Sequence, residues 1–246
     1  MTNRTIFGRN PILEAIKSET QKVEKIFFLD GLDKEGRRIL QMIRDKDIYH
    51  EKLDKHEIFN KCQSKQHQGF VAVTAPIRNS SLNRIYENKK QGLRVVMVPQ
   101  IQDPQNLGAL IRHCEHFAID LLVVGTKGSC DIQLGSVAKT SAGAIEHMPV
   151  LSSSRIEKVL DELKEKEFLI YGLEGKSEKS LLDITPNDNH NLCLVLGSEG
   201  FGLKESTLNH IDSVVSIPRQ GKVNSLNISG AALTGVLWLK GWLKSN

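Results

Sequence analysis

Short apolar runs in the second half of the chain constrain the fold more than any other feature. They cover residues 93–98, 119–124, 168–171, 192–196 and 214–217, and helical segments alternate with them. The runs are too short for buried helices, and they lack the alternation of half-exposed strands. Strands buried on both faces of a parallel sheet have this pattern. We therefore predict an α/β domain over residues 91–246, with helices on both faces of a parallel sheet.

The front of the chain predicts a smaller α/β unit over residues 1–75. Asn10 followed by Pro11 is typical of a helix start, with Asn10 as the N-cap and proline at the first helical position. Strands are expected over 25–29, 48–53 and 69–75, and helices over 34–44 and 55–62. Residues 76–90 are rich in Asn, Ser and Lys, which indicates a linker.

Charge is distributed unevenly between these two parts. Residues 1–90 hold 18 Lys and Arg against 12 Asp and Glu, whereas residues 91–246 hold 15 against 17. With 39% hydrophobic and 25% charged residues, the chain has the composition of a soluble globular protein. The asymmetry suggests that the two parts have different partners, the alternative being a chance excess of surface cations.

Several classes of protein are excluded by what the sequence lacks. No apolar stretch approaches the roughly 20 residues of a membrane span, and residues 1–10 lack the apolar core of a secretory signal. The four cysteines form no C-x-x-C pair and have no histidine at metal-ligand spacing: Cys62, Cys114, Cys130 and Cys193. We expect a cytoplasmic protein with reduced cysteines and without a metal.

Chemistry-bearing residues gather after the apolar runs, where ligands bind in open α/β sheets. Segments 102–108, 172–175, 197–202 and 218–227 are dense in glycine and polar side chains. The spacing of Gly197, Gly200 and Gly202 is not a dinucleotide fingerprint, and a plain turn explains it equally well. Taken singly, Asn106 resembles an N-cap and Arg112 a surface arginine. Their joint occurrence at successive strand ends indicates a site.

Three of these segments resemble, in the right order, the motifs of the SpoU or TrmH-like branch of the SPOUT methyltransferases. The segments are DPQNLGALIR at 103–112, LVLGSEGFGL at 194–203 and IPRQGKVNSLNIS at 217–229. Segments 8–16 and 67–72 are similar to the start and end of the L30e/L7Ae-like substrate-binding domain of the ribosomal-RNA members. The resemblance implies an α/β fold with a C-terminal trefoil-knotted domain, bound S-adenosylmethionine, and methylation of a ribose 2′-hydroxyl in RNA.

The resemblance also implies roles for particular residues. The family's catalytic arginine corresponds to Arg112, and its companions are Asn106, Glu199, Ser225 and Asn227. The implied cofactor-binding positions are Leu173, Glu174, Gly175, Leu196, Gly197, Gly200, Ile217 and Leu226. The cations expected to meet RNA are Arg4, Arg9, Arg37, Arg38, Arg219 and Lys222. Arginine is too basic to serve easily as a general base, so we expect Arg112 to bind RNA phosphate and polarise the hydroxyl, with Asn106 orienting it.

Substrate identity stays open, because Ser198, Phe201, Arg219 and Lys222 depart from the family pattern. The front domain favours a guanosine of large-subunit ribosomal RNA. A tRNA guanosine, a resistance-type ribosomal methyltransferase and a non-catalytic RNA-binding protein are the alternatives. The family implies a homodimer through the first-motif helix and the C-terminal helix, whose apolar residues at 233–242 are equally explained by burial within the domain.

Overall fold

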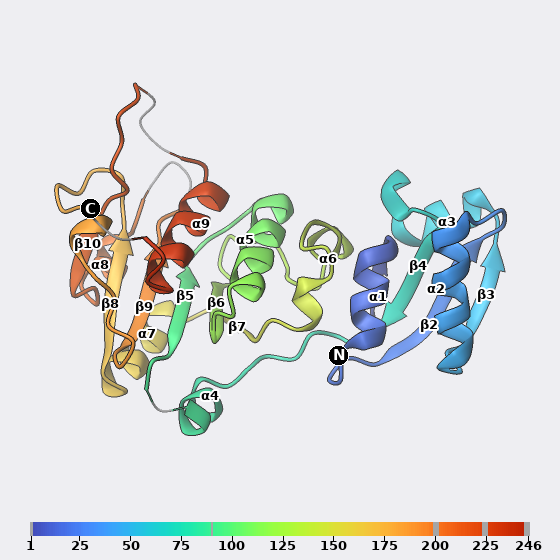
Figure 1. Ribbon diagram of the computed structural model, residues 1–246, viewed down its shortest axis with the longest axis horizontal. Coiled ribbons are helices and arrows are strands. Elements are labelled where there is room, and N and C mark those ends of the chain that lie inside the picture. The colour runs from blue at the N-terminus through green and yellow to red at the C-terminus, as the bar shows by residue number, and fades with distance from the viewer. Residues whose placement is uncertain (1, 90, 199–201, 223–225, 244–246) are drawn as a thin grey trace.

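The N-terminal unit is a four-stranded mixed sheet in the order β1-β4-β2-β3 (Figure 1). This computed structural model describes residues 2–89, 91–198, 202–222 and 226–243. β4 pairs antiparallel with β1 and β2, while β3 runs parallel to β2 at the sheet edge. The strands are β1 (Arg4–Phe7), β2 (Val23–Leu29), β3 (His50–Leu53) and β4 (Phe70–Thr74).

Helices cover both faces of this sheet because side chains alternate along each strand. Ile26 and its neighbours pack with the helices α1 (Arg9–Lys17) and α2 (Lys34–Asp45), and Phe27 packs with Ile58 of α3 (Lys55–Cys62). α1 begins two residues earlier than the sequence predicts. Its N-cap residue is Gly8, with a φ of 94°, and Asn10 lies inside the first turn of the helix. A glycine suits this position because the chain reverses there from β1 into α1.

The C-terminal unit contains a six-stranded sheet in which every pairing is parallel, as predicted. Its order is β10-β8-β9-β5-β6-β7. The strands are β5 (Arg94–Val98), β6 (Leu121–Gly125), β7 (Val150–Ser153), β8 (Phe168–Leu173), β9 (Asn191–Leu196) and β10 (Ser213–Val215). The sequence did not reveal β7, because only two apolar residues at its start mark this edge strand.

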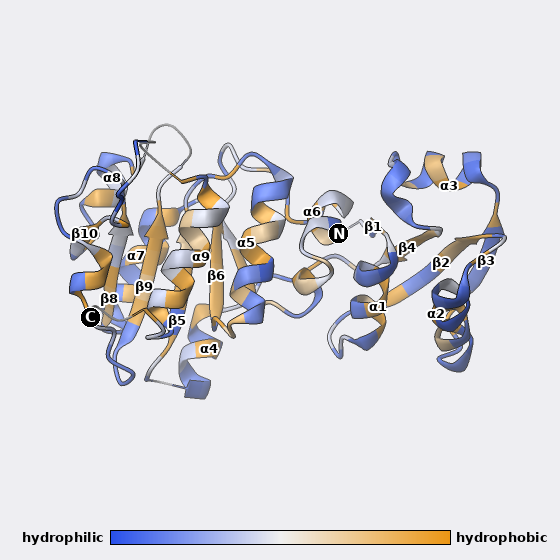
Figure 2. Ribbon diagram, turned by 45° about the horizontal axis from the view of Figure 1, so that its top comes forward, coloured by the Kyte–Doolittle hydropathy of each residue, from blue (hydrophilic) through white to orange (hydrophobic). Residues whose placement is uncertain are grey.

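Two sets of helices enclose the parallel sheet, and Figure 2 shows its hydrophobic strands between them. One cluster joins the sheet to α5 (Pro104–His116), α6 (Gly135–Thr140) and α9 (Ile228–Leu239). The other joins it to α4 (Leu82–Lys89), α7 (Ile156–Glu165) and α8 (Glu205–Leu208). The segment expected to be a linker thus contains α4, which buries Leu82 under the sheet. Short 3₁₀ turns occur at η1 (Lys65–His67), η2 (Ala144–Glu146) and η3 (Leu181–Asp183).

The two units pack directly against each other. Ile6 and Ile12 belong to the same hydrophobic cluster as Ile145 and Met148. At this boundary Arg4 of β1 forms a buried ion pair with Glu146 of η2. The Ser18 hydroxyl donates to the Glu146 carbonyl at 2.8 Å, and the Arg4 Nε donates to the Thr74 hydroxyl at 3.1 Å. The relative position of the units is therefore fixed by packing and by hydrogen bonds.

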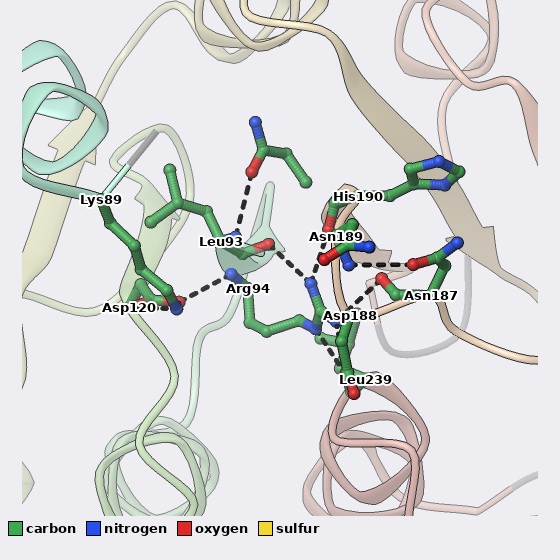
Figure 3. Close-up of polar contacts among 10 residues, drawn as sticks. Lys89, Leu93, Arg94, Asp120, Asn187, Asp188, Asn189, His190 and Leu239 are labelled. Carbon is green, nitrogen blue, oxygen red and sulfur yellow. Dashed lines mark hydrogen bonds and ion pairs between the residues drawn. The ribbon is translucent and has the colours of Figure 1, made fainter. Parts of the chain in front are cut away.

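A second buried cation, Arg94, is the first residue of β5 and so lies at the opposite end of the parallel sheet from the glycine loops. Figure 3 shows its polar contacts. Its Nε donates to the Leu239 carbonyl in the last turn of α9 at 2.7 Å. Its terminal nitrogens donate to the carbonyls of His190 at 2.7 Å and of Asn187 at 3.1 Å. Arg94 therefore joins the start of β5 to the end of the C-terminal helix and to the turn before β9.

Candidate active site

The predicted cofactor-binding segments converge at the carboxyl edge of the parallel sheet. Leu173 of β8 is in register with Leu196 of β9 and with Val215 of β10, so Glu174 and Gly197 leave the sheet at the same level. The border between β9 and β5 separates strands β8–β10 from strands β5–β7. Such a switch point is where open α/β sheets bind ligands.

The second-motif loop closes on itself through glycine. The Ser198 amide donates to the Gly202 carbonyl at 3.0 Å, and the Gly202 amide donates back to Ser198 at 3.1 Å. Gly202 has a φ of 67°, and a Cβ there would fall on the carboxylate of Glu174. The Glu174 amide in turn donates to the Val215 carbonyl at 2.9 Å. The ends of β8, β9 and β10 are therefore held together, with a carboxylate against the glycine backbone.

The third-motif segment contributes an apolar wall and a helix cap. Ile217 is half-buried against the core, whereas Leu226 is 57% exposed. The Asn227 side chain accepts from the Gly230 amide at 2.8 Å and so caps α9. This interaction satisfies one of the amide donors that a helix start leaves unpaired. Asn227 therefore has a structural role whatever it does in chemistry.

The first motif forms α5, and its cap is Asp103 rather than Asn106. The Asp103 carboxylate accepts from the Gln105 amide at 2.8 Å, which places Asn106 inside the first turn. Arg112 follows six residues later, about 9 Å along the helix axis and about 120° around it. Because of this separation, α5 does not place Arg112 and Asn106 side by side. The Arg112 side chain is exposed. Next to Arg112, burial lowers the pKa of His113, which keeps that imidazole neutral.

The cations expected to meet RNA differ in their availability. Arg4 is 4% exposed and is paired with Glu146, so it cannot reach RNA. The prediction for Arg4 is therefore wrong, because this cation lies at a buried boundary between the two units and not at the surface. Arg9 binds Asp33 at 2.8 Å and Glu35 at 2.6 Å. The remaining predicted cations are exposed: Arg37, Arg38, Arg219 and Lys222.

Some predicted residues lie outside the part of the chain that the structure describes, namely Glu199, Gly200, Phe201 and Ser225. Among the described residues, no group of three His, Cys, Asp or Glu side chains is arranged to hold a metal ion. No helix within 2–89, 91–198, 202–222 or 226–243 has the length and apolarity to cross a bilayer.

Both parts of the chain match known families. The SpoU rRNA Methylase family matches residues 93–236. The RNA 2′-O ribose methyltransferase substrate-binding family matches residues 5–80. A protein of Staphylococcus haemolyticus named for the TrmH family of tRNA/rRNA methyltransferases is 31% identical over 236 residues, which cover 94% of this chain and 93% of the relative.

Solved structures share the fold along nearly the whole chain. The AdoMet complex of the SpoU methyltransferase AviRb from Streptomyces viridochromogenes superposes with a TM-score of 0.78 at 21% identity, covering 96% of this chain and 88% of the other. An AdoMet-bound rRNA methyltransferase from Sinorhizobium meliloti gives 0.82 at 16% identity, covering 99% and 88%. The chain therefore belongs to the SpoU, or TrmH-like, family of S-adenosylmethionine-dependent RNA methyltransferases.

Proposed function

We propose that this enzyme methylates the ribose 2′-hydroxyl of a guanosine in large-subunit ribosomal RNA. The observation that carries the proposal is the likeness over both domains, including the substrate-binding part. The Sinorhizobium meliloti rRNA methyltransferase covers 99% of this chain. Two solved structures that concern tRNA, one on methylation of C/U34 and one of a tRNA-modifying enzyme from A. aeolicus, cover only 63% and 65% of this chain. The substrate-binding domain therefore favours ribosomal RNA over tRNA as the substrate.

The carboxyl edge of the parallel sheet fits the cofactor in both shape and chemistry. A Cβ at Gly197 would lie 3.0 Å from the Gly202 backbone, so a glycine there lets the two arms of the loop pack closely and leaves their backbone groups uncovered by a side chain. Half-buried Ile217 and exposed Leu226 offer apolar surface for an adenine ring. We expect backbone groups of 173–175, 196–197 and 200 to hold the adenosine, within the trefoil knot that the family implies. S-adenosylmethionine supplies an electrophilic methyl group on a sulfonium.

The protein's part in the reaction is to orient the ribose and to stabilise charge. We expect Arg112 to bind the RNA phosphate through its planar fork and to polarise the 2′-hydroxyl, while the proton leaves to phosphate or water. Asn106, Glu199 and Ser225 would shape this pocket. Because the Asn227 oxygen caps α9, only the amide nitrogen of that side chain is left to donate to RNA.

We expect a homodimer through α5 and α9. Val236, Trp238 and Leu239 are buried within the domain, so they cannot be the contact. Trp242, however, is 64% exposed and packs edge-on against Phe117, just after α5, at 5.2 Å. An exposed tryptophan on a second aromatic ring is typical of an interface anchor. Light scattering should give twice the chain mass, and Trp242→Ser should shift it toward the monomer.

The decisive experiment maps 2′-O-methylated sites across ribosomal and transfer RNA in cells with and without the gene. Loss of one guanosine mark in large-subunit RNA is expected. Loss of a tRNA mark with ribosomal RNA unchanged would replace the proposed substrate with the alternative. Titration with S-adenosylmethionine tests the non-catalytic alternative, which requires that no cofactor binds.

The four free thiols are those expected of a cytoplasmic enzyme, the compartment in which we place this reaction.

A further inference from the structure

A pocket lies between α3 and the edge strand β3, at the end of the molecule farthest from β10 and α9 (Figure 1). It arises because α3 packs its one buried residue, Ile58, over the inner strands and leaves the β3 side of the sheet uncovered. Phe27 is in register with Glu51, so both point to this side. The pocket measures about 460 Å³, and its lining residues are Lys25, Phe27, Glu51, Leu53, Glu57, Asn60 and Lys61.

Two ammonium groups lie over aromatic rings in and beside this pocket. The Lys61 Nζ is 4.1 Å from the centre of the Phe27 ring. The Lys25 Nζ is 5.0 Å from the same ring and 4.6 Å from the ring of Tyr49. Phe27 is 4% exposed and forms the floor, whereas Tyr49 is 61% exposed beside the pocket. Exposed aromatic rings flanked by cations are the usual surface for stacking unpaired RNA bases.

Hydrogen-bond acceptors complete the lining. Glu51 accepts from Lys25 at 3.0 Å, and this hydrogen bond raises the pKa of Lys25, so the amine stays charged. Glu57 accepts from the Asp54 amide at 2.9 Å, which fixes its carboxylate at the start of α3. Two lysines and two glutamates leave the lining with no net charge. A bare anion gains little there, and an acidic peptide would meet both carboxylates.

A nucleotide suits this combination better than either of those ligands. Its base offers a flat ring for Tyr49 and amino groups for Glu51 or Glu57, and its phosphate suits the lysines. The match of residues 5–80 to an RNA substrate-binding family makes RNA the polymer that this unit meets. We propose that the pocket binds one unstacked nucleotide of the substrate RNA, as an anchor remote from the methylated ribose. This inference rests on the proposed function.

The test uses the full-length enzyme, labelled S-adenosylmethionine and total RNA from cells that lack the gene. Tyr49→Ala should raise the KM for RNA by roughly 5- to 100-fold, since one stacked base is lost. Lys61→Gln should also raise the KM, because it removes a cation that faces the phosphate. Both variants should leave kcat near wild type, since the pocket is far from the chemistry. Tyr49→Phe should restore the KM because it keeps the ring. Lys166→Gln is the matched control, because Lys166 lies 5.2 Å from the Tyr86 ring outside the pocket.

A direct readout is ultraviolet cross-linking of the wild-type enzyme to the same RNA. A nucleotide adduct is expected on the tryptic peptide 47–52, which contains Tyr49. Two results would overturn the proposed nucleotide-binding pocket and leave the methyltransferase function standing. One is that adducts occur only on other peptides, and the other is that Tyr49→Ala and Lys61→Gln have the same KM as Lys166→Gln. A wild-type enzyme that binds no S-adenosylmethionine and transfers no methyl group would instead overturn the proposed function, and the anchor with it.

Discussion

The buried ion pair between Arg4 and Glu146 gives a quantitative test of how the two units are joined. Their side chains are 2% and 0% exposed, so water screens neither charge. Removing one partner leaves the other charge buried, which costs about 3–5 kcal/mol in the free energy of unfolding. Arg4→Met and Glu146→Leu should each show this loss. Arg4→Met combined with Glu146→Leu should match or exceed wild type, since buried pairs are often no better than apolar side chains of similar size.

Incomplete hydrogen bonding of the pair is the physical reason to expect the double variant to recover stability. Within the described part of the chain, one terminal nitrogen of Arg4 and one oxygen of Glu146 are buried without a hydrogen-bond partner. Burial also raises the pKa of Glu146 to about 6, although Arg4 opposes the shift. The pair therefore does not fully recover the cost of its own desolvation.

Urea unfolding at neutral pH, followed by circular dichroism, measures all four proteins, and the double-mutant cycle gives the coupling energy. The control is Glu14→Gln, which breaks two partly exposed contacts, one with His147 across the same boundary and one with Lys17, and should cost no more than about 1 kcal/mol. If the single variants lose under about 1 kcal/mol and the coupling energy is near zero, the pair is not buried in solution. A double variant as unstable as the singles would refute the desolvation argument.

Four further predictions follow from the site and from the same boundary. Arg112→Lys keeps the charge but loses the planar fork, so kcat should fall by roughly 10²-fold in methyl-transfer assays; near-wild-type turnover would contradict the proposed orientation. Asn227→Ala removes both the cap and the amide donor, so it should cost about 1 kcal/mol of unfolding free energy and lower turnover. Asn227→Ser keeps the cap and lacks only the amide donor, so it should have wild-type stability but the low turnover of Asn227→Ala. Gly202→Ala places a side chain on a residue with a φ of 67°, so it should lower the free energy of unfolding by about 1 kcal/mol and weaken cofactor binding measured by calorimetry. Gly221→Ala is the control and should have neither effect, because its added Cβ would meet nothing within 4 Å. Folding raises the pKa of Glu146 from 4.5 to about 6, so the folded protein binds more protons than the unfolded chain between these pH values. The free energy of unfolding should therefore fall by about 2 kcal/mol as the pH rises through this window. A variant that lacks this carboxyl should not show this fall, and identical pH profiles of wild type and variant would contradict the prediction.

The parallel sheet was readable from the sequence because five of its strands are continuous apolar runs. β7 was not, since Ser152 and Ser153 interrupt the pattern at the sheet edge. α4 was missed because a polar surface helix with one buried residue, Leu82, differs little from a charged linker. Periodicity reports burial within one element, so elements with little burial leave little signal.

The meeting of the candidate site's segments at one edge of the sheet was predictable from local motifs, whereas contacts between distant segments were not. The glycines at the strand ends pointed to the carboxyl edge, and the register of Leu173 with Leu196 explains why those segments meet. The burial of Arg4 depends on Glu146, 142 residues away, and no local pattern records that contact. The pocket beside Tyr49 was likewise not anticipated, because it arises from what α3 leaves uncovered.

The contact between Arg94 and Leu239 has a consequence for how the chain is made. The donor and its acceptor are 145 residues apart, and the acceptor lies in the last turn of α9. At about 5–20 residues per second, synthesis leaves Arg94 without this acceptor for roughly 7–30 s. A nascent chain stopped before α9 would carry a cation at a place that should be buried. Burial of the Arg94 guanidinium is thereby coupled to the synthesis of α9, and a product truncated before α9 would expose the defect to cellular proteases.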